Sequence, residues 1–407
     1  MTVEVTGENT TVRTARVAAI LVALVLAGNN AASYLLSLVA ARVLAPGAFG
    51  ELSSLLAVLV VGVVPAMGLQ TVVALRVARG KTPSGPLLAL GLTTSAIVTA
   101  AALVAAPLLV LLLHLGSVAP ALWLAGTLAP LTLLGVFHGM LQGGKRFAML
   151  SGLLALEGAA KVGGSVLGLL LARDATGALT GSALGSLTVV FAGWVVCGRP
   201  RPHGSGRRSA REVLHTVQAM LALVLLVNLD LVLARHTLPA REAGEYALGA
   251  IVTKIAYWLP QAVGVLVLPR LANPADRRRA LPVALAVSAT LDAAVLAVSL
   301  VFGDRLLPFI GGAGYTGSTM PVWPFALAGS MLALVQILLF ARLADDRPAL
   351  VTALMWAAVA VETLLVITWL HHSAAQVVTV SASCVAALAL AGAVVELRSR
   401  RRAAATL

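Results

Sequence analysis

Two lysines, Lys161 and Lys254, lie inside long apolar stretches of the sequence. An ionisable side chain is costly in the hydrocarbon of a membrane, so it normally faces protein or water and is a candidate for function. No acid lies three or four residues from Lys254, so its counter-charge comes from another helix, for example from Asp230, or from an anionic ligand. Lys161 stands four residues after Glu157, where an ion pair within one helix is an equal alternative. We therefore predict that both lysines can contact an anionic substrate.

Four acids also lie inside long apolar stretches, namely Glu157, Asp230, Asp292 and Glu362. Asp292 and Glu362 have no lysine or arginine three or four residues away. Surroundings of low dielectric constant favour the neutral form of a carboxyl group, so such a group can take up and release a proton near neutral pH. The four acids are therefore candidates for coupling to a proton or a sodium ion. A neutral, hydrogen-bonded acid with a structural role is the alternative.

Polar residues of two further kinds could contact a substrate. Asn29 and Asn30 lie midway along the first apolar stretch, where amides either join helices or line a wet cavity for sugar hydroxyls. Arg76 and Arg270 lie at the ends of two apolar stretches, where arginine commonly anchors a helix at the membrane surface. A contact with a phosphate at the cytoplasmic mouth is the other role open to these two arginines.

The residues that catalysis or a metal site would need are not grouped in this sequence. Cys197 and Cys384 lie in apolar segments and are too few for a disulfide framework or a metal cluster. His371 and His372 are adjacent and lack the i,i+4 spacing of a helical metal pair. We therefore expect translocation without a catalytic residue, a metal or a cofactor, and we do not expect an enzyme.

The elements that must position these residues are membrane-spanning helices. Hydrophobic residues make up 59% of the chain and charged residues 11%, and the mean hydropathy is +0.97, whereas about a quarter of the residues of a soluble protein are charged. A helix needs about 20 apolar residues to cross the hydrocarbon core. The sequence contains twelve such stretches: 17–41, 52–77, 87–113, 119–141, 148–171, 177–196, 213–233, 246–268, 281–301, 321–341, 349–370 and 374–395. The predicted fold class is an all-α integral membrane protein.

Most of the 29 lysine and arginine residues fall on one side of these predicted spans, together with both termini. The opposite side carries Arg42, Arg173, Arg235, Arg241 and Arg305. Because cytoplasmic loops are enriched in lysine and arginine, both termini are predicted to be cytoplasmic. The net charge of +13 follows from this topology. Nucleic acid is not an expected partner, because the basic residues form short clusters between apolar runs.

The chain also contains an internal repeat. A shift of 194 residues brings three pairs into register, namely Gly50 with Gly244, Glu51 with Glu245, and Arg76 with Arg270. Similarity at a fixed period indicates duplicated structural units. We predict two six-helix lobes, 1–197 and 212–407, joined by the basic cytoplasmic linker 198–211. An even number of helices in each lobe relates the lobes by an axis along the membrane normal.

Four short strings carry a family resemblance: AARVLAPGAFGE after the first span, then LDLVLA, GEY and LPRLA. Together with the two-lobe layout they resemble the polysaccharide-exporter branch of the multidrug/oligosaccharidyl-lipid/polysaccharide (MOP) flippases. The resemblance implies a MATE/MOP-like fold that exports polyprenyl-pyrophosphate-linked oligosaccharides across the bacterial cytoplasmic membrane, by alternating access, for cell-surface polysaccharide biosynthesis. It also implies a cationic cavity, for which Lys254 and Lys161 are the matching positions.

The implied partners are the lipid-linked glycan, membrane lipids, a proton or sodium ion, and the glycan polymerase machinery. Lipid II flippases of the same superfamily have spans beyond the twelve predicted here, which favours a carrier of another glycan. A cation-coupled drug or metabolite antiporter of the same fold is the alternative, because Glu157, Asp292 and Glu362 suit organic cations, whereas Lys254 opposes them. A glycan polymerase would need a large external domain, and no predicted loop is long enough to form one.

Overall fold

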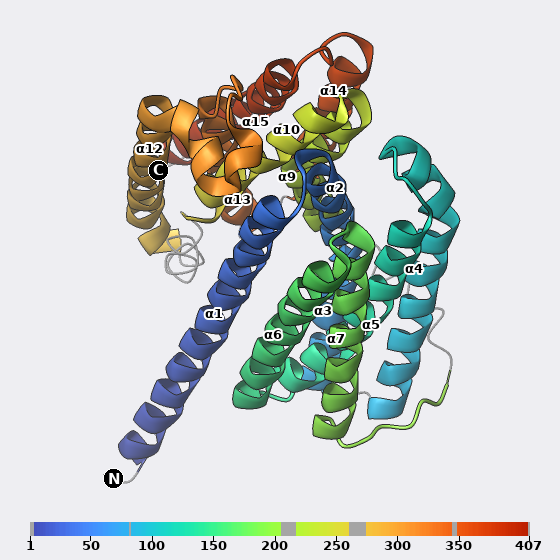
Figure 1. Cartoon of the computed structure of the whole chain (residues 1–407). Coiled ribbons are helices and arrows are strands. Elements are labelled where there is room, and N and C mark those ends of the chain that lie inside the picture. Colours follow the sequence, from blue (N-terminus) through green and yellow to red (C-terminus); the bar gives the residue numbers. More distant parts are fainter. Residues whose placement is uncertain (1–3, 81–82, 205–216, 260–273, 344–347, 406–407) are drawn as a thin grey trace. The chain divides into compact units, whose positions relative to one another are not determined.

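The computed structural model describes residues 4–80, 83–204, 217–259, 274–343 and 348–405, and the regular structure of these residues is entirely helical, as expected. Figure 1 shows the helices in chain order. The first seven are α1 (Glu4–Val43), α2 (Pro46–Gly62), α3 (Val64–Ala78), α4 (Ser84–Leu112), α5 (Ala119–Gly143), α6 (Phe147–Ala172) and α7 (Ala175–Val196). The later ones are α9 (Gln218–Thr237), α10 (Ala240–Trp258), α12 (Pro274–Gly311), the short 3-10 helix η1 (Ala313–Tyr315), α13 (Trp323–Leu343), α14 (Pro348–Thr368) and α15 (Ala374–Ala405).

The chain is a multi-pass membrane protein. Within the described ranges, nine helical segments are long and apolar enough to cross a membrane: Leu24–Val43, Pro46–Ala78, Ser84–Leu112, Ala119–Gly143, Phe147–Ala172, Ala175–Val196, Met220–Thr237, Ala286–Gly303 and Ala374–Val394. Two shorter apolar helices are Trp323–Leu338 and Thr352–Thr368. The total of twelve spans stays a prediction, because the eighth, 246–268, begins in α10 and its last residues, 260–268, lie outside the described part of the chain.

Large apolar side chains on the outside of the helices fit this membrane setting. Val104 on α4 is 82% exposed and Leu171 on α6 is 78% exposed. A soluble protein rarely leaves extended apolar surface in water. The exposed apolar faces of these helices are therefore the surfaces that lipid would cover.

The structure divides into two compact units. Unit 1 contains Met1–Val43, Gly62–Leu111 and Leu115–Val217, and unit 2 contains Leu44–Val61, Leu112–His114 and Gln218–Leu407. Helix α2 therefore belongs to unit 2, although it lies in the first quarter of the sequence. The predicted lobes 1–197 and 212–407 and their linker 198–211 follow the sequence repeat instead, and residues 205–211 of that linker lie outside the described part of the chain.

The passage from unit 2 to unit 1 coincides with a break in the second membrane span. Helix α2 ends at Gly62 and α3 begins at Val64, with Pro65 in its first turn. Proline has no N–H to donate to the preceding turn, but it fits well at the start of a new helix. The predicted span 52–77 is thus two helices, and each belongs to a different unit.

Glycine lets the helices of unit 1 pack with their backbones in contact. On α5, Gly135, Gly139 and Gly143 face the main chain of α3. Between α6 and α7, Gly164 and Gly181 face each other's main chain. Small residues are favoured at helix interfaces in membranes because they allow this close approach. These interfaces hold α3 against α5, and α6 against α7, in fixed register.

Unit 2 has an apolar core that α9, α10, α13, α14 and α15 build together. Its buried residues include Leu223, Leu226, Tyr257, Leu332, Met355, Val359 and Val385. Helix α2 packs against α10 near the start of both helices, where a Cβ atom on Gly50 would lie 3.0 Å from the nitrogen of Gly244. These two glycines are equivalent in the sequence repeat, so corresponding positions of the two repeats touch each other.

Candidate functional site

Two buried side chains of unit 2, Asp230 on α9 and Tyr246 on α10, form a hydrogen-bonded pair. Asp230 is 5% exposed, and its carboxylate accepts a hydrogen bond of 2.8 Å from the hydroxyl of Tyr246. The ring of Tyr246 is fully buried and packs edge-on against Phe325 of α13. A buried carboxylate needs such a donor, because burial without a hydrogen bond is costly. Tyr246 therefore fixes the position of the Asp230 carboxylate.

Glu362 on α14 lies in the same surroundings. It is fully buried, and it is placed beside Asp230, Tyr246 and the hydroxyl of Ser381 on α15. Among the described residues, neither carboxylate oxygen of Glu362 meets the criteria for a hydrogen bond. We call Asp230, Tyr246 and Glu362 the acidic cluster of unit 2. An acidic pair at this depth can bind a proton or a cation, either of which would relieve the cost of two buried negative charges.

Lys254 lies on α10, two turns after Tyr246, and is half-buried. Its charge interacts with that of Asp230. The structure thus brings one predicted substrate residue, Lys254, together with two predicted ion-coupling residues, Asp230 and Glu362. A cation beside the acidic cluster can respond to ion binding, because a change in the charge of the cluster alters the field at the ammonium group.

Asp292, the remaining acid of unit 2, lies on α12. It is 5% exposed and faces Ser330 of α13. Within the described part of the chain its two carboxylate oxygens have no hydrogen-bond partner. The same part of the chain contains no group of three or more His, Cys, Asp or Glu residues placed to hold a metal ion.

The predicted substrate residues of unit 1 lie on α1, α3 and α6. Asn29 and Asn30 are half-buried, and the amide of Asn29 donates a hydrogen bond of 2.9 Å to the carbonyl of Leu154 on α6. This contact is the helix-joining role of the two roles considered for Asn29. Lys161 on α6 and Arg76 on α3 are half-buried. Arg270 lies outside the described residues.

Glu157 has a partner that sequence reasoning missed. The Nε2 atom of His138 on α5 lies 3.5 Å from a carboxylate oxygen of Glu157 on α6, and His138 is 4% exposed. In the described structure the ionisable partner of Glu157 is thus His138, and Glu157 forms no ion pair with Lys161. A histidine inside a predicted span was a signal that could have directed attention to α5.

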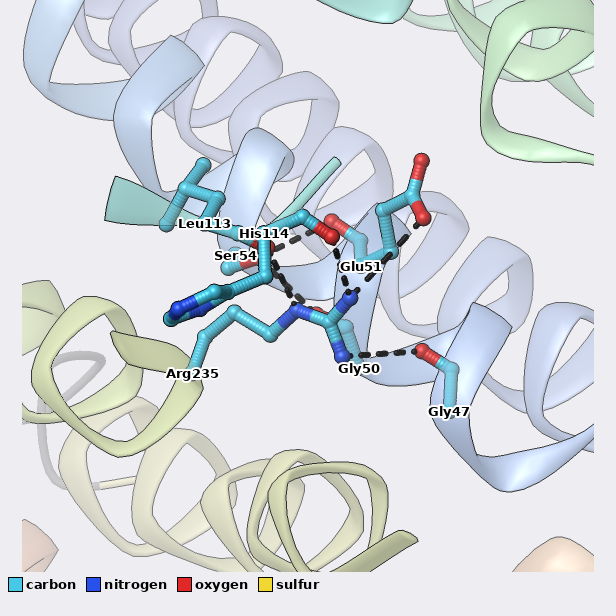
Figure 2. A network of polar contacts seen from close by, with 7 residues as sticks. All are labelled: Gly47, Gly50, Glu51, Ser54, Leu113, His114 and Arg235. Atoms are coloured by element: carbon cyan, nitrogen blue, oxygen red, sulfur yellow. Dashed lines mark hydrogen bonds and ion pairs between the residues drawn. The ribbon is translucent and has the colours of Figure 1, made fainter. Parts of the chain in front are cut away.

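Arg235 is the second functional candidate that the sequence did not single out. It was counted with the charges of the predicted outer side, but its side chain is buried near the end of α9. Figure 2 shows its guanidinium group directed at the end of α4 and the start of α2. It donates hydrogen bonds to the carbonyls of Leu113 (2.9 Å), Gly47 (3.3 Å) and His114 (3.4 Å), and it lies 3.9 Å from Glu51. Because the last carbonyls of a helix lack partners within it, Arg235 caps α4.

The neighbouring histidines reinforce this connection. His236 makes a 3.0 Å contact through Nδ1 with the carbonyl of Leu112, and its ring stacks on that of His114. The repeat equivalent of Glu51 is Glu245, which also has an arginine partner: it accepts hydrogen bonds from Arg241 (3.3 Å) and from Ser318 (2.8 Å). The two repeats therefore use the same glutamate position to tie neighbouring segments of unit 2 together.

Several solved structures of known proteins are similar to this fold. The lipid II flippase MurJ, in an inward closed conformation, superposes with a TM-score of 0.73 at 12% identity, over 91% of this chain and 86% of that chain. The chain has the fold of the MOP-superfamily transporters. The eukaryotic MATE transporter AtDTX14 gives a TM-score of 0.61 at 16% identity, over 94% and 96% of the two chains. A MOP-superfamily transporter from Pyrococcus furiosus gives 0.60 at 12% identity, over 95% and 96%.

Sequence comparisons give less. A family of unknown function, DUF2637, matches residues 284–406, which is less than half of the chain. A comparison with curated proteins gives no match. The structural similarities confirm the expected MATE/MOP-like fold. The branch of the superfamily and the substrate are matters for a proposal. The similar structures named above are transporters or flippases rather than enzymes.

Proposed function

We propose that the protein is a transporter that moves a polyprenyl-pyrophosphate-linked oligosaccharide across the bacterial cytoplasmic membrane by alternating access, for the synthesis of a cell-surface polysaccharide. The observation that carries this proposal is the higher similarity to the lipid II flippase, with a TM-score of 0.73, than to the two other transporters, with 0.61 and 0.60. Lipid II is itself a lipid-linked substrate. The sequence strings that resemble the polysaccharide-exporter branch support a glycan carrier. We place both termini in the cytoplasm because of the distribution of lysine and arginine.

The pyrophosphate sets the main energetic demand on such a carrier. The transfer of an isolated anion from water to hydrocarbon costs on the order of tens of kcal/mol by Born solvation, as it does for any unpaired charge. A cationic side chain in a wet protein environment removes most of that cost without any bond chemistry. We assign this contact to Lys254, with Lys161, Arg76 and Arg270 as further cationic positions. We assign the contacts with sugar hydroxyls to Asn30 and to the side-chain oxygen of Asn29, whose amide group donates to Leu154.

We assign ion coupling to the acidic cluster of unit 2, with Asp292 and Glu157 as further candidates. Asp230 and Glu362 are both buried, and Glu362 keeps carboxylate oxygens that no described residue engages. A proton or sodium ion bound there would reduce the negative charge beside Lys254. Lys254 would then interact less with Asp230 and more with an anionic headgroup, which links ion binding to substrate binding through one lysine.

The test uses purified protein in liposomes that contain a fluorescent polyprenyl-pyrophosphate oligosaccharide. Lys254→Gln should weaken transport about 10- to 150-fold, the equivalent of one charge-assisted contact of about 1.5–3 kcal/mol. Lys145→Gln is the matched control, because Lys145 is exposed between α5 and α6, and it should transport normally.

A double variant separates a substrate contact from a structural charge pair. If Lys254 only balances Asp230, the variant Asp230→Asn/Lys254→Gln should recover the transport that Lys254→Gln loses. If Lys254 contacts the pyrophosphate, the double variant should stay impaired. Normal transport by Lys254→Gln alone, with the protein correctly inserted, would remove Lys254 from the substrate site.

The second candidate is a cation-coupled drug or metabolite antiporter. The observation that favours it is the similarity in fold to MATE transporters over 94% of the chain, together with the buried acids. Uptake of organic cations into the same liposomes, driven by a proton or sodium gradient, distinguishes the two. Transport of organic cations and not of the lipid-linked glycan would decide for the antiporter.

A further inference from the structure

The pair formed by His138 and Glu157 in unit 1 has no part in the coupling site assigned to unit 2. His138 is 4% exposed, and its Nε2 atom has no hydrogen-bond partner among the described residues. That atom points at the Glu157 carboxylate, 3.5 Å away. A buried imidazole nitrogen without a partner needs an explanation, because nearly all buried polar atoms in proteins are hydrogen-bonded.

The charged groups around His138 are few. Helices α3, α4, α6 and α7 pack against α5. Helices α4 and α7 have no ionisable residue between their ends, and α3 has Arg76. At the level of His138, α5 meets α3 at Gln70, so Arg76 lies about 9 Å further along the helix axis. Helix α6 carries Glu157 and Lys161, and Glu157 is the charge that faces the imidazole.

The surroundings of Glu157 are similarly simple. Helix α1 packs on α6, and it presents Asn29 at Gly158, the residue next to Glu157. The nearest charged residues on α1 are Arg16 and Arg42. Each is 13 residues from Asn29, a distance of about 20 Å along the helix. Glu157 is therefore directed to His138 on one side and has a neutral amide on the other.

We propose that His138 and Glu157 together bind one proton, which makes this pair a proton site of unit 1. With the proton the pair is neutral overall, whether as imidazolium and carboxylate or as imidazole and carboxylic acid. Without it a single negative charge remains in surroundings of low dielectric constant. Two groups this close titrate as one system, so the proton belongs to the pair and not to either residue.

The chemistry of the pair favours a proton over a metal cation. Sodium, like other hard cations, takes several oxygen ligands, and this pair offers one carboxylate and one nitrogen. Imidazole suits the softer transition metals, but those need more than two protein ligands to be held tightly. A proton needs only two acceptors within hydrogen-bonding reach, and a contraction of the 3.5 Å separation by a few tenths of an ångström would supply them. The inference deepens the proposed function, because it names the proton as an ion that unit 1 binds.

The direct test follows the histidine rings by NMR in protein labelled with nitrogen-15 histidine and held in lipid nanodiscs. The chain has 7 histidines, and the signals of His138 are those absent from His138→Gln. These signals should change with pH, and in Glu157→Gln the midpoint of the change should move to lower pH by about one unit or more, because the carboxylate that favours the imidazolium is lost. His203, exposed in the loop after α7, is the internal control, and its signals should be the same in both proteins.

The result that would overturn the proposal is a His138 ring whose signals do not change with pH, or one whose midpoint is the same in Glu157→Gln. If Glu157→Gln does not fold, judged by size-exclusion chromatography, Glu157→Asp serves instead. The shorter side chain keeps the charge but withdraws it from the imidazole, so the midpoint should still move.

Transport measured across a pH gradient keeps this inference separate from the proposed function. If the wild type moves the lipid-linked glycan and both single variants lose the effect of the gradient, both proposals stand. Coupled titration without any glycan transport would refute the proposed function and leave the proton site standing. Transport with uncoupled titration would refute the proton site alone.

Discussion

Replacing Arg235 with glutamine should destabilise unit 2 more than any other single change to an arginine described above. The guanidinium group is buried, with a side chain 8% exposed, and it joins three segments that are far apart in the sequence: α9, the end of α4, and the start of α2 (Figure 2). Glutamine is shorter and carries one amide donor group, so it cannot reach all three carbonyls. The carbonyls of Leu113 and His114 would then have no donor at the end of α4.

The contacts of Arg235 set the size of the effect. The hydrogen bond to Leu113 is 2.9 Å long, and a charged donor at this distance contributes about 1.5–3 kcal/mol. The bonds to Gly47 and His114, at 3.3 and 3.4 Å, exceed the usual upper distance of about 3.2 Å, so we count about 0.5–1 kcal/mol for each. The expected loss of unfolding free energy is therefore about 2.5–5 kcal/mol, which overlaps the usual cost of about 3–5 kcal/mol for removing one partner from a buried charged pair.

The assay is unfolding of the purified protein by SDS in mixed micelles, followed by the fluorescence of its six tryptophans. Arg235→Lys should lose about 2 kcal/mol, because lysine keeps the charge without the fork of five donors. Arg201→Gln is the control, since Arg201 is exposed in a loop. A value for Arg235→Gln within about 0.5 kcal/mol of the wild type, the range typical of surface substitutions, would refute this account of the network.

Two further predictions follow from the packing and from the thiols. Gly164→Ala should lower the unfolding free energy by about 1–3 kcal/mol, because its Cβ would collide with the carbonyl of Gly181. Gly163→Ala is the control: the new methyl group has open space around it, so this variant should be as stable as the wild type. Equal stability of the two variants would contradict the close helix contact. Burial raises the pKa of Cys197 to about 11, so in a Cys384→Ser background alkylation by a maleimide should be slow at neutral pH and should rise about tenfold for each pH unit up to that value, since the thiolate is the nucleophile. Rapid alkylation at neutral pH would show that the thiol is not buried.

Much of the fold could be predicted from the sequence because one physical quantity dominates it. Runs of apolar residues such as 119–141 and 374–395 correspond to α5 and to the first part of α15, since a chain in hydrocarbon must satisfy its backbone hydrogen bonds within a helix. The break in the span 52–77 was less visible. Pro65 marks it, but a proline can also kink a continuous helix, and only packing decides between the two outcomes.

The candidate site was predicted in its residue types but not in its pairings. Asp230 and Glu362 were both selected as buried acids, yet nothing in the sequence indicates that Tyr246 donates to one of them, because the contact joins two helices. The same reason explains His138: its partner Glu157 is 19 positions away on the next helix, outside any i,i+4 pattern. Arg235 was misread because a basic residue near the end of a span normally faces the membrane surface, whereas here the end of α4 accepts its hydrogen bonds.

The contact between Gly50 and Gly244 bears on how this chain can be divided. Repeat-related residues that meet each other resemble the two copies of one residue on the axis of a symmetric dimer. In the present chain α2 comes from the first half of the sequence but packs with helices of the second half. A polypeptide ending near residue 204 would therefore contain α2 without the helices that it packs against, and a second polypeptide starting near 217 would contain those helices without α2. The two pieces should accumulate in cells only when they are synthesised together.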